Sequence, residues 1–75
     1  MMKLFTKTIC PKCMWVKTEI QQAGLDVEII NIDHNETEKQ RLIDAGFLTV
    51  PVLEHEGKFI GDVNEIISHI ELVHQ

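Results

Sequence analysis

The sequence predicts one mixed α/β domain, in which a four-stranded mixed sheet has helices on its faces and the elements follow the order βαβαββα. Between residues 3 and 33, a β-prone run, a helical stretch and a β-branched run follow one another, as in a parallel βαβ unit. Residues 52–60 read as a glycine-containing hairpin, and residues 63–73 have the strongest helical periodicity of the chain.

The composition is that of an ordinary globular protein. Seventy-five residues form one domain, 1–75, with 44% hydrophobic residues and a net charge of −5. That charge argues against a nucleic-acid partner held through its phosphates. The start of the chain lacks the apolar run of a signal peptide, and no stretch reaches membrane-spanning length. We therefore expect a monomeric cytoplasmic protein that binds neither nucleic acid nor membrane.

The first strand and helix are expected at Lys3–Thr6 and Pro11–Ala23, with Gly24 as the helix C-cap. The apolar positions of this helix recur at i, i+4 and i+7, so this face packs on the sheet. Met14 and Trp15 lie well off that face, next to the cysteines. They either pack locally over the helix or form a surface that contacts a partner.

The middle of the chain predicts a strand and a weaker helix. Residues 26–33 are β-branched densely enough for a central strand buried on both faces, parallel to the first. Asn35–Glu38 is a capping box that opens a helix through Ala45, ending at Gly46. The apolar content of this helix is thin, so we expect it to cover an edge of the sheet.

The last third predicts a hairpin and a helix. Val52–Glu54 and Lys58–Ile60 are strands joined by the three residues 55–57, which include a glycine suited to positive φ. Asp62–Glu65 is a second capping box, and apolar residues follow it at helical spacing through Val73.

Both cysteines lie where the first helix begins. Pro11 suits the first helical position, where its missing N–H costs nothing, and Cys10 precedes it. The unpaired N–H groups and the positive end of the helix dipole favour a thiolate at Cys10, and Lys7 and Lys12 act in the same direction. Cys13 lies in the first turn, about 60° from the centre of the buried face. We expect Cys10 to be reactive and Cys13 to stay protonated.

Two other interpretations of the Cys-x-x-Cys pair exist. It could be half of a zinc or iron-sulfur site, but the four histidines have no metal-ligand spacing and we expect them on the solvated surface. A cluster shared by two chains stays an alternative. A purely structural disulfide would close a very small loop and stabilise little. In a reducing compartment a catalytic pair is the favoured interpretation, with no bound metal.

A Cys-x-x-Cys that opens the helix of a βαβ unit is the thioredoxin-like redox signature. Phe5-Thr6-Lys7 leads into Cys10-Pro11-Lys12-Cys13, Thr49-Val50-Pro51 precedes the hairpin, and Gly61 begins the final loop. With these motifs in order, the chain resembles the glutaredoxin family over essentially its whole length. It is most similar to the short members, including the redoxins that serve ribonucleotide reductase. The resemblance implies a thioredoxin-like fold.

The resemblance also implies a binding site. Pro51 would be cis and face the cysteines, so that the backbone of Val50 meets an extended thiol substrate. Lys7 would neutralise a carboxylate of glutathione or of a partner. Cys10 attacks a disulfide and Cys13 resolves the mixed disulfide. The residues expected to bind substrate are Lys7, Pro11, Lys12, Thr49, Val50, Pro51, Gly61, Asp62, Val63 and Asn64.

The final loop departs from the family pattern. Glutathione-using members have Gly-Gly, then Cys or Thr, then Asp, whereas this chain has Gly61-Asp62-Val63-Asn64. The carboxylate of Asp62 would repel the γ-glutamyl carboxylate of glutathione. The loop also lacks the Trp-Ser-Gly-Phe pattern of the ribonucleotide reductase redoxins. The source of electrons therefore stays open between glutathione, as a co-substrate, and thioredoxin reductase.

Three hypotheses follow. The first is a cytosolic dithiol oxidoreductase of the glutaredoxin family that reduces protein or glutathione mixed disulfides and has no bound cofactor. The second is a redoxin that thioredoxin reductase recharges and that donates electrons to ribonucleotide reductase. The third, from another class, is a metal or iron-sulfur carrier without turnover.

Overall fold

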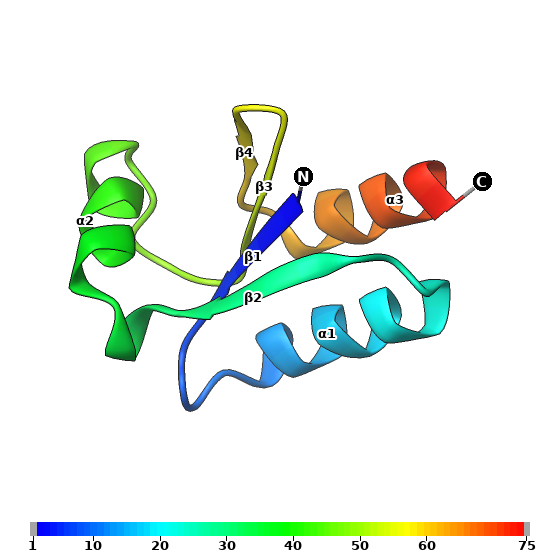
Figure 1. Ribbon diagram of the computed structural model, residues 1–75, viewed down its shortest axis with the longest axis horizontal. Helices are drawn as coiled ribbons and strands as arrows, with labels where there is room; N and C mark the ends of the chain where they lie inside the picture. Colours follow the sequence, from blue (N-terminus) through cyan, green and yellow to red (C-terminus); the bar gives the residue numbers. More distant parts are fainter. Residues whose placement is uncertain (1, 75) are drawn as a thin grey trace.

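A computed structural model describes residues 2–74, and the elements follow the order that the sequence predicts (Figure 1). Their bounds are β1 Met2–Thr6, α1 Pro11–Ala23, β2 Val27–Asn31, the 3-10 turn η1 Ile32–His34, α2 Glu36–Asp44, β3 Val52–His55, β4 Lys58–Ile60 and α3 Val63–His74. Within residues 2–74, no helix combines the length and the apolar character needed to cross a membrane.

The sheet is mixed, as predicted, but β2 lies at its edge. The strand order is β2-β1-β3-β4; β1 pairs with β2 in parallel and with β3 antiparallel, and β3 pairs with β4 antiparallel. The prediction of a central β2 buried on both faces is wrong, because only Ile30 is buried and Ile29 is 44% exposed. The predicted strand also ends early, in η1. β-branched residues favour a strand at an edge as well as at the centre, so their density does not give its place in the sheet.

The sheet separates two apolar layers, because successive side chains of a strand point to opposite faces. One layer packs α1 and α3 on the sheet and contains Met2, Leu4, Val16, Ile20, Leu53, Ile66 and Ile70. The other layer lies under α2 and contains Phe5, Ile30, Leu42 and Val52. Figure 1 shows α2 on one side of the sheet and α1 with α3 on the other. The second helix therefore covers a face, not the edge that its thin apolar content suggested.

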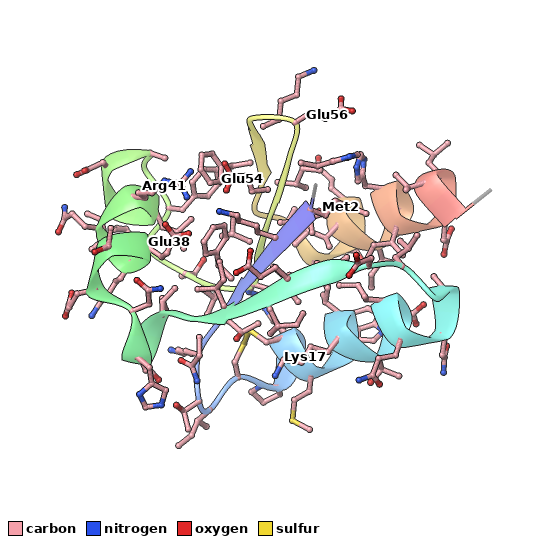
Figure 2. The ribbon with its side chains drawn as sticks, in the orientation of Figure 1. Met2, Lys17, Glu38, Arg41, Glu54 and Glu56 are labelled. Carbon is pink, nitrogen blue, oxygen red and sulfur yellow. A yellow bond between two sulfur atoms is a disulfide. The ribbon has the colours of Figure 1, made fainter. Side chains whose placement is uncertain are left out.

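An ion pair adds to the attachment of α2. The Arg41 guanidinium donates to Glu54 of β3 at 2.9 Å and to Glu38 at 3.1 Å (Figure 2). It also lies over the Phe59 ring, 5.8 Å from its centroid. The hydrogen bonds to Glu54 and then to Glu38 raise the pKa of Arg41 above its ordinary value. Because Leu42 is the buried apolar residue of α2, these polar contacts complete its attachment to the sheet.

His55 differs from the prediction in two ways. It belongs to β3 and pairs with Lys58, so the hairpin loop has the two residues Glu56 and Gly57, both at positive φ as in a type I′ turn. It is also half-buried, and its Nδ1 lies 2.8 Å from Nε2 of His69 in α3. These two histidines therefore link β3 to α3, although we expected solvated side chains. His34 is exposed, and the side chain of His74 lies outside the described part.

Candidate functional site

Cys10 is the N-cap of α1. Its backbone is extended, with φ −155°, and Pro11 occupies the first helical position, as the sequence predicts. The backbone N–H of Cys13 donates to Sγ of Cys10 at 3.1 Å, and the N–H of Met14 donates to the Cys10 carbonyl at 3.2 Å. The Cys10 sulfur thus accepts an amide at the positive end of a helix whose first turn has no acidic residue.

A disulfide joins Cys10 and Cys13, whose Cα atoms are 5.2 Å apart. Cys10 is 9% exposed and Cys13 is 1% exposed. Pro11 and Lys12, the residues between the cysteines, are exposed. Cys10 is thus the more exposed of the two cysteines, and Cys13 is buried on α1 together with Val16 and Ile20.

The 47–51 segment faces the cysteines from the other side. The Val50–Pro51 peptide bond is cis, as the resemblance implied, although the sequence alone favours trans. The carbonyl oxygen of Val50 lies 3.8 Å from Sγ of Cys10. Thr49 is exposed, Val50 is half-buried and Pro51 is buried. A backbone carbonyl therefore stands beside the sulfur that we expect to react.

A cavity of about 490 Å³ is lined by residues that flank the cysteines in sequence, by part of the 47–51 segment and by the final loop, although neither cysteine itself lines it. We call it the cysteine groove. Of the ten residues expected to bind substrate, it brings together all except the exposed Pro11. The lining residues are Lys7, Lys12, Trp15, Leu48, Thr49, Val50, Pro51, Gly61, Asp62, Val63 and Asn64. The roles of these residues stay predictions, but they share one surface.

Exposed apolar side chains surround the site. Met14 is 67% exposed and Trp15 is 49% exposed, which favours the interpretation that they contact a partner over local packing. Ile9 and Leu48, which no sequence pattern singled out, are 82% and 83% exposed. Leu48 and Trp15 both line the cysteine groove.

Charge in the cysteine groove is mixed. Lys7 and Lys12 are exposed and line it together with Asp62. Oδ2 of Asp62 accepts the backbone N–H of Glu65 at 3.3 Å, so Asp62 caps α3 as the capping box predicts. An anionic ligand in the groove would therefore meet both lysines and a carboxylate.

Gly61 joins the final loop closely to the 47–51 segment. A Cβ atom on Gly61 would lie 2.8 Å from the ring of Phe47, too close for any other residue without movement of that ring. Phe47 in turn packs on Phe59 with ring centroids 5.6 Å apart. The glycine that the resemblance singled out thus has a steric reason, because it lets two sides of the groove approach.

Asn31 and Asp33 are site-forming residues that the sequence reasoning missed. Oδ2 of Asp33 accepts the backbone N–H of Thr8 at 2.9 Å, and Nδ2 of Asn31 donates to the Thr8 hydroxyl at 3.2 Å. These bonds attach the segment before Cys10 to the end of β2. The backbone N–H of Thr8, then its hydroxyl, lower the pKa of Asp33, with smaller contributions from His34 and Lys7. Asn and Asp at the end of a strand or just after it often bond to nearby backbone, which was the available signal.

The hypothesis of a metal site within one chain requires further ligands beside the two cysteines. Within residues 2–74, no group of three or more His, Cys, Asp or Glu side chains is arranged to hold a metal ion. A cluster shared between chains is a separate question, which a purified sample answers.

Comparison with known proteins gives consistent likenesses. The sequence model of the glutaredoxin family matches residues 2–60. No curated protein sequence matches the chain. Among solved structures, NrdH-redoxin from Escherichia coli, described as a glutaredoxin-like protein with a thioredoxin-like activity profile, has a TM-score of 0.86 at 23% identity over 99% of this chain and 95% of its own.

Two plant proteins are more similar in sequence. Wheat glutaredoxin is 31% identical, with a TM-score of 0.74 over 93% of this chain and 70% of its own. Buckwheat glutaredoxin, solved with glutathione, is 26% identical, with a TM-score of 0.76 over 97% of this chain and 70% of its own. Together with the family match, these likenesses confirm the thioredoxin-like fold that the sequence predicted.

The carboxylate of Asp33 should stabilise the fold in its ionised form. Because the folded-state pKa lies below the ordinary 3.8, this stabilisation is present above that pH and is lost as pH falls through the folded pKa. We expect Asp33→Asn to lower the Tm at neutral pH, and the difference from wild type to shrink in acid. Thermal unfolding of both proteins across this pH range measures it.

Asp26→Asn is the matched control, because Asp26 is an exposed acid in the turn before β2. It should change the Tm less than Asp33→Asn at neutral pH. A Tm of Asp33→Asn equal to that of wild type at neutral pH, or a deficit that persists unchanged in acid, would contradict the role given to Asp33.

Proposed function

The chain belongs to the glutaredoxin family, and on that premise we propose that it is a thiol-disulfide oxidoreductase that reduces protein or glutathione mixed disulfides through Cys10 and Cys13. One observation supports this most directly. The N–H of Cys13 points at Sγ of Cys10 at 3.1 Å, at the amino end of α1. A donor and a helix dipole at that atom stabilise a thiolate, the species that attacks disulfides.

The proposed reaction has two steps. In the first, the Cys10 thiolate attacks a substrate disulfide, forms a mixed disulfide and releases one substrate thiolate. In the second, Cys13 loses its proton and attacks Sγ of Cys10, which forms the Cys10–Cys13 disulfide and releases the other substrate thiol. Two electrons pass from the protein to the substrate. The burial of Cys13 keeps it from reacting with a second molecule until the mixed disulfide lies beside it.

The substrate lies in the cysteine groove with its backbone against Val50. The carbonyl oxygen of Val50, 3.8 Å from Sγ of Cys10, is available as an acceptor for an extended chain. Lys7 and Lys12 attract carboxylates of the substrate. The partners are thus disulfide-containing proteins, and the protein acts as a monomer in the cytoplasm, where thiols are kept reduced.

A redoxin recharged by thioredoxin reductase is the second candidate. The carboxylate of Asp62 in the groove disfavours glutathione, the co-substrate of the first candidate. The likeness to NrdH-redoxin, a protein described by its thioredoxin-like activity profile, agrees with this. In that case a ribonucleotide reductase is the substrate protein. Oxidation of NADPH, followed with glutathione and glutathione reductase and then with thioredoxin reductase alone, decides between the two donors.

The cysteine roles predict two different outcomes. Cys10→Ser should abolish disulfide reduction, because it removes the nucleophile. Cys13→Ser should still attack the substrate, but the mixed disulfide should accumulate because no thiol resolves it. Mass spectrometry of each variant after mixing with a disulfide substrate measures the trapped adduct.

One exposed residue, Thr18, provides the control. Two results would contradict the proposal. Thr18→Ser, an exposed hydroxyl on α1 outside the groove, should reduce the substrate at the wild-type rate. A trapped adduct on Cys13 in the Cys10→Ser variant would reverse the two roles. Visible absorbance with stoichiometric iron in the purified protein, and no disulfide reduction, would favour the carrier alternative.

The negative charge of Asp62 should weaken the binding of glutathione. Asp62→Asn keeps an oxygen that caps α3 but removes the negative charge from the groove. We expect the KM for a glutathione mixed disulfide to fall by about twofold to fivefold, because exposed charge pairs contribute up to about 1 kcal/mol. The kcat should change little. Steady-state kinetics at low salt measures both values.

Glu65→Gln is the matched control, because Glu65 lies one turn along α3 and does not line the cysteine groove. It should leave the KM unchanged. An unchanged or higher KM for Asp62→Asn would show that Asp62 does not oppose glutathione.

A further inference from the structure

A second cavity, of about 250 Å³, opens between α2 and the 47–51 segment. We call it the α2 cavity. Leu42, Ile43 and Phe47 supply apolar lining from α2 and the turn after it, and Lys7 and Lys39 are its cationic residues. Whole small-molecule sites usually occupy about 300 to 1,000 Å³, so this cavity is too small for a complete ligand and suits one side chain of a larger one.

The α2 cavity is continuous with the cysteine groove. Lys7, Leu48, Thr49 and Val50 line both of them. Leu48 is 83% exposed, so an occupant of either cavity can contact it. A chain that lies along Val50 with its disulfide at Cys10 therefore passes the mouth of the α2 cavity with a neighbouring side chain.

The chemistry of the α2 cavity indicates what that side chain is. Its floor offers buried Leu42 and 41%-exposed Ile43 to an apolar group. Lys7 and Lys39 are both exposed, while Asp33, the acid in the lining, already accepts the Thr8 amide at 2.9 Å. Within residues 2–74 neither lysine forms an ion pair, although Lys7 contributes to lowering the pKa of Asp33. Two lysines against the one carboxylate of Asp33 leave the lining with a net positive charge, which favours a carboxylate next to the apolar group. Glutathione has no apolar side chain that could fill this floor.

We propose that the α2 cavity is a specificity pocket for protein substrates: it binds an apolar side chain near the reactive cysteine of the substrate, while Lys39 and Lys7 bind an acidic residue beside it. This inference rests on the proposed function, because it concerns substrates of the same reaction. It assigns the protein a preference for disulfides whose cysteine lies beside an apolar and an acidic residue, whichever donor recharges the protein.

The test compares four short peptides that differ only beside a central cysteine. Each side of that cysteine carries one residue that is leucine or serine and one that is aspartate or asparagine. The four combinations of these two choices give the four peptides. Each peptide is linked by a disulfide to 2-nitro-5-thiobenzoate. Reduced protein, freed of other thiols, attacks the peptide sulfur, releases the coloured thiolate and then forms its own disulfide as the peptide thiol leaves. Stopped-flow absorbance at protein excess gives the rate constant of each peptide.

We expect the leucine-aspartate peptide to react about tenfold faster than the serine-asparagine peptide, as a filled apolar pocket typically gives. Ile43→Ser should reduce the advantage of leucine over serine to near one. Lys39→Gln should reduce the advantage of aspartate over asparagine by about threefold, an effect that salt should weaken. Ile43→Ser thus tests the preference for an apolar residue, and Lys39→Gln tests the preference for an acidic one.

Two controls match these variants. Ile29→Ser changes an isoleucine of similar exposure, 44%, on β2, and Lys58→Gln removes an exposed lysine at the hairpin; neither residue lines the α2 cavity. Both should keep the wild-type ratios. Circular dichroism of each variant verifies folding, and Lys39→Gln gives a second, exposed site if Ile43→Ser unfolds.

Each outcome decides a different claim. Equal rates for all four peptides would overturn the specificity pocket and leave the proposed oxidoreductase standing. Ratios that Ile43→Ser and Lys39→Gln leave unchanged would also overturn it, because another surface would then select the peptide. Failure to release thiobenzoate from any peptide would overturn the proposed function itself.

Discussion

The hydrogen bond from the Cys13 amide to Sγ of Cys10 is the interaction on which the site depends. It makes the sulfur the cap of its own helix, so the atom that caps α1 is also the one that we propose as the nucleophile. Every other feature of the site holds that sulfur in position or limits what reaches it. Asp33 attaches the preceding segment through the Thr8 amide, Pro11 starts the helix without requiring a partner, and Val50 lies opposite.

The surroundings of the site are connected through α2 and two aromatic rings. Arg41 joins α2 to β3 through Glu54, and Phe47 follows α2 and packs on Phe59. Gly61 then approaches Phe47 so closely that no side chain fits between them. The final loop, the 47–51 segment and the sheet are therefore in close contact through these residues. Substitutions in α2 should therefore alter both the cysteine groove and the α2 cavity, because residues of the 47–51 segment, which follows α2, line both.

Local signals predicted the parts of the fold that local physics decides. Pro11 and Gly24 bound α1, and Asn35 and Asp62 cap the next two helices through their own side-chain oxygens. Three features depend on which distant segments meet, so no local pattern contained them. They are the edge position of β2, the packing of α2 on a face of the sheet, and the contact between His55 and His69. The groove residues came from family motifs, whereas Asn31 and Asp33 act through Thr8, far away in sequence.

The most direct test of this account is the pH dependence of alkylation in the fully reduced protein, with the modified cysteine identified by mass spectrometry. If the Cys13 amide and the amino end of α1 stabilise a thiolate, Cys10 should be alkylated rapidly well below the pKa of about 8.5 of a free thiol, and Cys13 should lag behind it. Alkylation of Cys10 that rises only near that value, or that is no faster than alkylation of Cys13, would contradict the account.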